Sequence, residues 1–191
     1  MTAFELVFTL ISIITSLALT NLLTGFVDLL RNSERVRFSV LHALWAWAAF
    51  ASTIGNWASY WELRTVTAWP AWAVLGTLAL TVVQYVFCAL VTPEMPTEGG
   101  VNLVAFHQRE HRRYMAAFLA LFGAALVSNF AFGGAHFYTG WSRDSAFSAA
   151  GITLGLLAFF VNVRWVQLVV AAMIATLLTV YMVITCNVVA A

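Results

Sequence analysis

Six long apolar stretches constrain the fold of this chain more than any other feature of its sequence. They occupy about residues 5–30, 38–61, 69–91, 114–137, 146–162 and 165–187. A helix needs about 20 mainly apolar residues to cross the hydrocarbon core of a membrane, and each stretch is close to that length. Of the 191 residues, 62% are hydrophobic and 9% are charged, whereas a water-soluble domain has about 25% charged residues. The sequence therefore predicts an all-α, polytopic membrane protein, with six transmembrane helices in a single transmembrane domain over residues 1–191.

Two connections between these stretches allow more specific predictions. The fifth and sixth stretches are separated only by Asn162, Val163 and Arg164. One helix through both would be about 60 Å long, twice the thickness of the hydrocarbon core, so we expect the chain to reverse near Arg164. In the loop over 92–113, prolines and two consecutive glycines interrupt the helix. Asn102 is placed to cap a new helix that continues into the fourth stretch.

The arginine residues are distributed unevenly between the two sides of the predicted bundle. Arg64 and Arg143 lie on one side, and the first, third and fifth connections on the other side hold Arg31, Arg35, Arg37, Arg109, Arg112, Arg113 and Arg164. Because basic residues accumulate in cytoplasmic loops, we expect loop 92–113 in the cytoplasm and both termini on the periplasmic side. Each even-numbered helix begins with arginine and an aromatic residue, which predicts three helical hairpins. Their lipid-headgroup anchors are Arg37, Arg113 and Arg164.

The composition excludes several classes of function. All nine basic residues are arginines, so no lysine is available to form a Schiff base with an aldehyde such as retinal. The two cysteines are too few for a disulfide framework or an iron–sulfur site. The net charge of +1 includes no basic face that nucleic acid would need. We therefore expect no cofactor and no nucleic-acid partner.

The histidines suggest a metal site only weakly. The segment from His107 to His111 has the H-x-x-E-H pattern of a class of zinc peptidases, and on a helix His107 and His111 share one face. A third protein ligand is required, yet the only acid after Glu110 is Asp144, which we expect on the other side of the membrane. We therefore expect no metal site and retain His107, Glu110 and His111 as weak candidates. His42 and His136 are expected in opposite leaflets, which excludes one haem between them.

Polar side chains recur along the first four predicted helices. In the first helix, hydroxyl residues and Asp28 follow one another at spacings of four, which places them on one face. With the polar residues of the next three helices they predict a polar track consisting of Ser16, Thr20, Asn21, Thr24, Asp28, His42, Asn56, Thr81, Gln84 and Asn129. Packing between helices is the default interpretation of the stripe in the first helix, since small hydroxyl residues allow close approach and interhelical hydrogen bonds. Gly151 and Gly155 of the fifth helix likewise predict a dimerisation or packing seam.

Four segments of the chain resemble an uncharacterised family of small bacterial inner-membrane proteins with six predicted helices. They are residues 16–23, residues 35–38 with the following His42 and Trp45, residues 56–61, and residues 162–166. The resemblance implies a location in the bacterial inner membrane. Asn21 and Gln167 stand where histidines are expected in the relatives, so a metal or haem role is not carried over.

Three functions are compatible with these observations. The plentiful polar rows favour a small channel or passive transport protein, which we expect to be oligomeric in the lipid bilayer. The absence of a long soluble segment fits an accessory or assembly subunit of a larger membrane complex equally well. An interfacial membrane enzyme or metal-binding protein would depend on His107, Glu110 and His111.

Overall fold

The protein is all-α, and the part of the chain that the structure describes contains six α-helices, which overlap the six apolar stretches. The computed structural model describes residues 2–66, 69–96, 99–134 and 141–190. The helices are α1 (Ala3–Arg31), α2 (Val40–Ser59), α3 (Ala71–Val91), α4 (Leu103–Gly134), α5 (Trp141–Phe160) and α6 (Arg164–Ala190). The shorter elements are two 3-10 helices, η1 (Ser33–Arg35) and η2 (Tyr60–Thr65), and two strands, β1 (Val36–Arg37) and β2 (Val101–Asn102).

Four of these helices are long and apolar enough to cross a membrane, which identifies the chain as a membrane protein by length and composition. They are α1, α3, α4 over Leu103–Gly133 and α6 over Arg164–Val189. The other two, α2 and α5, are not among these candidates, and both contain polar residues, among them Ser52 and Asn56 in α2 and Asp144 and Ser148 in α5. Much of this polarity lies inside the bundle, because Ser52, Asp144 and Ser148 are buried.

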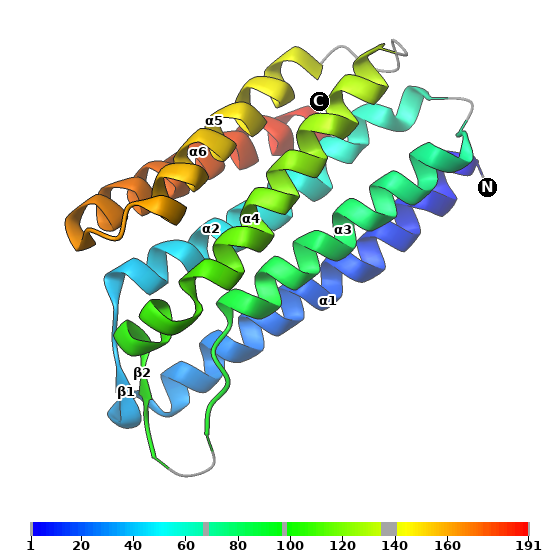
Figure 1. The fold of residues 1–191 in the computed structure, drawn as a ribbon. Helices are drawn as coiled ribbons and strands as arrows, with labels where there is room; N and C mark the ends of the chain where they lie inside the picture. The colour runs from blue at the N-terminus through cyan, green and yellow to red at the C-terminus, as the bar shows by residue number, and fades with distance from the viewer. Residues whose placement is uncertain (1, 67–68, 97–98, 135–140, 191) are drawn as a thin grey trace.

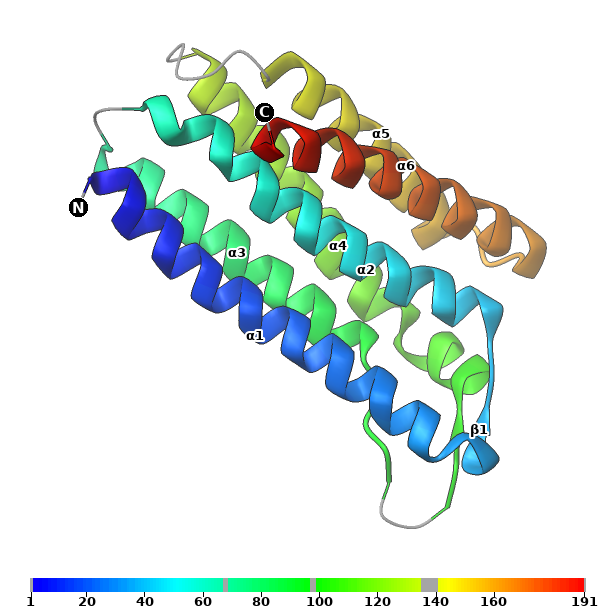
Figure 2. The ribbon, with the colours of Figure 1, turned by 180° about the vertical axis from the view of Figure 1, so that it is seen from behind.

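The helices alternate in direction, so both termini lie at the same end of the bundle (Figures 1 and 2). We call this end the terminal end, and the opposite end, which holds β1 and β2, the sheet end. The most extensive contacts join α2 to α6, α4 to α5 and α1 to α3. The contact between α1 and α2 is much smaller. The predicted hairpin arrangement therefore describes the direction of the chain but not the packing of its first two helices.

At the sheet end, two loops that are distant in sequence are joined. Strands β1 and β2 pair in parallel, with Val36 opposite Val101. The guanidinium of Arg35 donates to the carbonyl of Gly99, whose φ of +86° favours glycine. The Asn102 side chain accepts hydrogen bonds from the first turn of α4, at 3.1 Å from the amide of Val104, which confirms the predicted cap. The strand pairing itself was not predicted, because two residues carry no periodicity.

The connection between α5 and α6 confirms the predicted reversal near Arg164. Helix α5 ends at Phe160 and α6 begins at Arg164. The buried amide of Gln167 donates to the carbonyls of Ala158 and Val161, and so satisfies the end of α5. Gln167 therefore has a structural role in this turn.

The glycine seam of α5 packs within the protomer. A Cβ on Gly151 would lie 2.5 Å from the ring of Phe122, and one on Gly155 would lie 2.9 Å from the side chain of Leu119. Both neighbours belong to α4. Gly151 and Gly155 thus allow the close contact between α4 and α5.

Replacing Gly151 with leucine is expected to destabilise the protein by about 1–3 kcal/mol, the usual effect of overpacking. Unfolding of the purified protein in detergent, followed by circular dichroism, measures this change. Gly123→Ala in α4 is the control, because nothing lies within 4 Å of its Cβ position. Helix propensity predicts that Gly123→Ala is neutral or stabilising by up to about 1 kcal/mol. Equal midpoints for Gly151→Leu and the unsubstituted protein would contradict the close contact.

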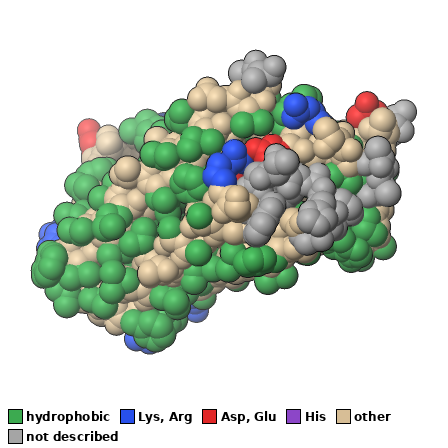
Figure 3. All heavy atoms as spheres, turned by 90° about the horizontal axis from the view of Figure 1, so that it is seen from above, with side chains coloured by type: hydrophobic (Ala, Val, Ile, Leu, Met, Phe, Trp, Pro, Cys, Tyr) green, Lys and Arg blue, Asp and Glu red, His purple; other side chains and the backbone are tan. Residues whose placement is uncertain are grey.

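Hydrophobic side chains cover most of the face shown in Figure 3, as expected for a bundle that lies in lipid. Inside the bundle, four aromatic side chains form a closed layer between its middle and the sheet end. All four are 0% exposed: Trp45, Phe87, Tyr114 and Phe118. The ring centroid of Phe118 lies 5.5 Å from those of both Trp45 and Phe87. We refer to these four residues as the aromatic layer.

Candidate functional site

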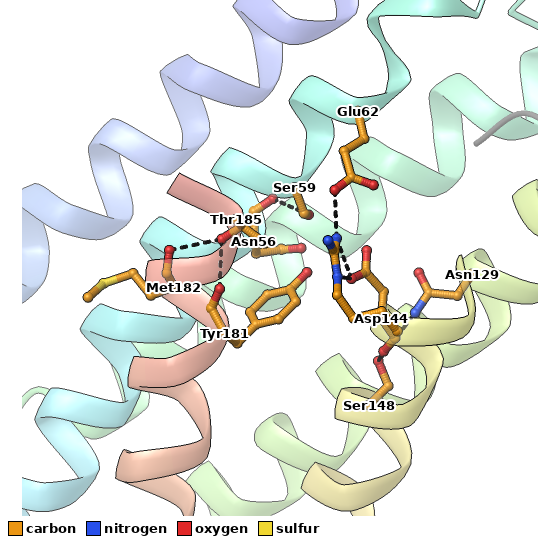
Figure 4. Close-up of polar contacts among 10 residues, drawn as sticks. Asn56, Ser59, Glu62, Asn129, Asp144, Ser148, Tyr181, Met182 and Thr185 are labelled. Carbon is orange, nitrogen blue, oxygen red and sulfur yellow. Dashed lines mark hydrogen bonds and ion pairs between the residues drawn. The ribbon is translucent and has the colours of Figure 1, made fainter. Parts of the chain in front are cut away.

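A network of charged side chains lies near the terminal end, where η2 meets the start of α5 (Figure 4). The guanidinium of Arg143 lies 2.6 Å from the carboxylate of Glu62 and 2.9 Å from that of Asp144. The Asp144 side chain is 7% exposed and that of Glu62 is 13% exposed. Two carboxylates and one guanidinium give this network a formal charge of −1.

Asp144 is the most deeply buried member of the network. It lies in the first turn of α5, where the positive end of the helix dipole favours a carboxylate. One turn later, the hydroxyl of Ser148 donates to the backbone carbonyl of Asp144 at 2.8 Å. Burial raises the pKa of Asp144 from 3.8 to about 6, although Arg143 acts in the opposite direction. Asp144 is therefore a carboxyl group that changes charge near neutral pH.

Two small cavities adjoin Asp144, with volumes of about 40 and 50 Å³. They share a lining that includes Asn56, Asp144, Ser148 and Tyr181. We call them the terminal cavities. One water molecule needs roughly 10–15 Å³ of cavity volume, so each cavity has room for only a few water molecules or for ions of similar size.

Tyr181 reaches the terminal cavities from α6 because α2 has a glycine opposite it. A Cβ on Gly55 would lie 2.8 Å from the Tyr181 ring. The ring of Phe147 lies 5.1 Å from that of Tyr181 on the α5 side. Figure 4 shows Tyr181 near Asn56 and beside the charged network. Gly55 thus positions an aromatic hydroxyl residue at the site.

The cavity of about 40 Å³ continues toward the middle of the bundle through Ser52 and Gln84. The amide nitrogen of Gln84 lies 2.9 Å from the hydroxyl of Thr53 and 3.2 Å from that of Ser52. The Gln84 carbonyl oxygen is buried and has no hydrogen-bond partner among the described residues. An unpaired buried carbonyl is unfavourable by about 1–3 kcal/mol, which makes it a ready acceptor for a hydrogen-bond donor or a ligand for a cation.

The structure brings together part of the predicted polar track. Asn56 and Gln84 line one terminal cavity, and Asn56 and Asn129 line the other. Asn129 donates to Ser148 at 3.4 Å. Thr81 is buried on the same side of α3, and its hydroxyl donates to the carbonyl of Thr77.

The residues of α1 lie apart from these cavities. Asn21 and Asp28 are half-buried, and the exposed residues are Ser16, Thr20 and Thr24. The hydroxyls of Ser16 and Thr20 donate to carbonyls one turn earlier in α1. Within one protomer, the continuous track through four helices is therefore not formed, because α1 presents its hydroxyl face outward.

The aromatic layer separates the terminal cavities from the sheet end. His42, predicted at the inner end of the track, lies beyond this layer and packs edge-on against Phe106. The ring centroids of Trp45 and Tyr114 are 5.6 Å apart, and both side chains are fully buried. The described structure is thus closed between the cavities and His42.

The weak metal candidates share a face but do not form a metal site. The rings of His107 and His111 stack at 5.6 Å, which confirms the predicted common face. The hydroxyl of Tyr114 hydrogen-bonds to Nδ1 of His107. Glu110 instead pairs with Arg109 at 2.8 Å and with Arg113 at 2.9 Å. Over the described ranges, no three His, Cys, Asp or Glu side chains are grouped to hold a metal ion.

The three predicted headgroup anchors are exposed at the sheet end: Arg37, Arg113 and Arg164. The aromatic residues that follow them differ. Phe38 and Trp165 are 66% and 69% exposed, but Tyr114 is fully buried in the aromatic layer. Of the three aromatic residues that follow these arginines, Tyr114 therefore packs inside the bundle, and Phe38 and Trp165 lie on its surface. His136 lies outside the described residues.

Sequence reasoning missed the charged network. Glu62 lies two residues from Arg64 in the sequence, but it pairs with Arg143, 81 residues away. The Arg64 guanidinium instead lies 5.6 Å from the ring of Trp61. The spacing of four between Asp144 and Ser148, with Asp144 at a helix start, was the one available signal that these side chains share a face.

Comparison with known proteins adds no family: no protein-family model, curated protein or solved structure matches the chain. The resemblance of four short segments to bacterial inner-membrane proteins remains an expectation. Functional assignment therefore depends on the terminal cavities, the charged network and the aromatic layer.

Proposed function

We propose that the protein is a small integral membrane protein that provides a passive pathway for a small monovalent cation. The observation that carries this proposal is the buried carboxylate of Asp144 at two small cavities, whose other polar lining residues are neutral and whose remaining lining is apolar. Ionisable side chains inside a membrane protein are unfavourable and are found mainly where they bind or conduct ions.

Charge and size favour a cation of small radius. The network of Glu62, Arg143 and Asp144 has a formal charge of −1, and neutral oxygens from Asn56, Tyr181 and Gln84 lie along the same path. Cavities of about 40 and 50 Å³ exclude solutes as large as a sugar or an amino acid. Oxygen ligands suit hard cations.

The aromatic layer is the barrier of this pathway in the proposal. Hydrophobic constrictions gate channels by excluding water. The rings of Trp45 and Phe118 close the path on the sheet-end side of Gln84, so conduction requires these rings to move. A passive mechanism fits better than a coupled one, because the path beyond Asp144 is lined by neutral side chains.

The proposal includes the orientation expected from the distribution of the arginine residues. Six spans would place the sheet end in the cytoplasm and both termini on the periplasmic side of a bacterial inner membrane. Seven arginines lie toward the sheet end and two lie near the terminal end, which supports this orientation through the preference of basic residues for the cytoplasm. The terminal cavities would then open toward the outside.

Cation flux into liposomes tests the pathway directly. We expect Asn56→Leu and Gln84→Leu each to lower thallium(I) influx by about tenfold, because each removes an oxygen from the cavity lining. Asn129→Leu is expected to have a smaller effect, since Asn129 lines only the cavity of about 50 Å³, whereas the cavity of about 40 Å³ is the one that continues to Gln84. Thr153→Val is the matched control, because Thr153 is exposed on α5 and its hydroxyl donates to its own helix. Unchanged influx in both Asn56→Leu and Gln84→Leu would reject the pathway.

A second candidate function is an accessory subunit of a membrane complex. The exposed hydroxyl row of α1 supports it, because Ser16, Thr20 and Thr24 lie among exposed apolar residues on the outside of the protomer. The same face would also suit a homo-oligomer. Native mass spectrometry in mild detergent distinguishes the two: recovery of a second protein at fixed stoichiometry supports the accessory subunit, and homo-oligomers alone support the cation pathway.

A further inference from the structure

A third cavity, which is larger and mostly apolar, lies between α1 and α2 at the sheet end. Its volume is about 500 Å³, within the range of ligand sites, which is roughly 300–1,000 Å³. Its walls are almost entirely apolar and include Leu22, Phe26, Ala46, Trp47 and Phe50. We call it the lateral groove. It is separate from the terminal cavities and shares no lining residue with them.

The lateral groove exists because α1 packs on α3 and not on α2. A Cβ on Gly25 would lie only 2.2 Å from the methyl carbon of Thr92, so Gly25 allows α1 to approach the end of α3 closely. This contact holds α1 at a distance from the start of α2, where contacts between the two helices are few. The small side chains of Ala43 and Ala46 leave the α2 wall of the groove open.

The dimensions of the lateral groove match one leaflet of a membrane. Its α1 wall runs from Leu22 to Leu30, about 12 Å at a rise of 1.5 Å per residue, and Ser33 and Phe38 extend it toward the sheet end. Half of the hydrocarbon core is about 15 Å thick. An acyl chain of a lipid in the leaflet at the sheet end would therefore fit along its length.

A histidine interrupts the apolar wall, to which Ser33 and Thr92 also contribute small polar side chains. His42 lines the lateral groove, is only 3% exposed, and its Nδ1 has no hydrogen-bond partner among the described residues. Phe106 occupies the space on another side of the ring, edge-on at 5.4 Å. A buried nitrogen without a partner is unfavourable, so a polar group of a bound molecule would find a partner here. His42 lies one turn from the sheet end of α2, near the depth at which lipid ester groups lie.

Positive charge adjoins the sheet end of the lateral groove. The groove is lined by Leu30, Val36 and Phe38. Arg31 directly follows Leu30, and Arg37 lies between Val36 and Phe38. Both arginines are exposed. Basic residues beside a cleft between membrane helices attract anionic lipid headgroups.

We propose that the lateral groove binds one anionic phospholipid. One acyl chain lies along α1 between Leu22 and Leu30, the ester region meets His42, and the phosphate group lies beside Arg31 and Arg37. The proposal is independent of the cation pathway, because it uses none of the residues of the terminal cavities.

Lipid retention tests this proposal. The purified protein is placed in nanodiscs that contain equal amounts of phosphatidylcholine and phosphatidylglycerol, and then released into mild detergent for native mass spectrometry. We expect one phosphatidylglycerol per protomer. Ala46→Trp fills the groove and is expected to reduce retention by about tenfold. Ala172→Trp, at an exposed position of α6, is the matched control and should retain the lipid.

The headgroup and the histidine are tested by variants that leave the groove open. Arg31→Gln with Arg37→Gln is expected to remove the preference for phosphatidylglycerol over phosphatidylcholine, and both positions are on the surface, so the fold is preserved. His42→Phe keeps an aromatic ring but removes the ring nitrogens, so it should weaken retention of the lipid.

Several results would overturn the proposal: no retained lipid in the unsubstituted protein, equal retention of the two lipids, or a dimer in place of bound lipid. Asp144→Asn should leave retention unchanged. Failure of the cation pathway and failure of this proposal are therefore distinguishable.

Discussion

Replacing Asp144 with asparagine is expected to reduce thallium(I) influx into liposomes at least about tenfold at pH 7.5. Asparagine has the shape of aspartate but carries no charge, so the variant removes the buried negative charge at the terminal cavities. Arg143 keeps its ion pair with Glu62 at 2.6 Å, which preserves the packing between η2 and α5. A tenfold loss corresponds to about 1.4 kcal/mol of cation stabilisation, a modest part of what a buried charge can supply.

The pH dependence of influx adds a second, independent test of Asp144. Because burial raises the pKa of Asp144 to about 6, the carboxyl is ionised above pH 6 and becomes neutral as the pH falls through that value. Influx through the unsubstituted protein should therefore fall between about pH 7 and pH 5. Asp144→Asn should show a flat profile over the same range. A flat profile in the unsubstituted protein, or an unchanged slope in the variant, contradicts a role for this carboxyl.

Replacing Phe118 with alanine is expected to have the largest effect on stability, about 3–5 kcal/mol, as for other fully buried aromatic residues. Phe118 is 0% exposed, and its ring lies 4.4 Å from that of Phe122 and 5.5 Å from those of Trp45 and Phe87. Truncation therefore leaves a void at the centre of the aromatic layer. The free energy of unfolding in mixed detergent, followed by circular dichroism against denaturant, measures the loss.

The control for Phe118→Ala is Val127→Ala on the same helix. Val127 is 70% exposed, so its truncation should change the free energy of unfolding by less than about 0.5 kcal/mol. If Phe118→Ala were as mild as this control, the aromatic layer would not be a packed barrier, and the closed state of the pathway would need another explanation.

The helices could be predicted from the sequence because each property they depend on is local. The apolar run from residue 69 to residue 91 predicts a helix by length alone, and Ala71–Val91 is the result. The reversal near Arg164 followed from a comparison of helix length with membrane thickness. The cap at Asn102 followed from the chemistry of one side chain.

The packing of the helices could not be predicted, since it depends on residues that contact one another only after folding. Gly25 looks like any glycine of an apolar helix, but the methyl group of Thr92 at its Cβ position shows that it allows α1 to approach the end of α3 closely. In this packing the hydroxyls of Ser16, Thr20 and Thr24 lie on the outside, and the lateral groove lies between α1 and α2. Periodicity showed that this row shares a face, but not which partner that face meets.

The charged network could not be predicted from the sequence for a related reason. Glu62, Arg143 and Asp144 lie between the predicted apolar stretches, where no periodic pattern indicates which side chains will pair. Their partners are 81 residues apart in the sequence, and only the approach of η2 to α5 brings them together. The three predicted residues that do reach this site, Asn56, Gln84 and Asn129, have in common that they lie on helices packed inside the bundle.

The most direct test of the cation pathway combines a variant of the aromatic layer with a variant of the buried carboxylate. Thallium(I) influx is measured for liposomes that contain the unsubstituted protein, Phe118→Ala, or Phe118→Ala with Asp144→Asn. The pathway predicts that Phe118→Ala opens the barrier and raises influx about tenfold or more, and that adding Asp144→Asn returns influx to the level of the unsubstituted protein or below. If the double variant conducts as well as Phe118→Ala alone, the cation does not pass Asp144, and the proposed pathway is wrong.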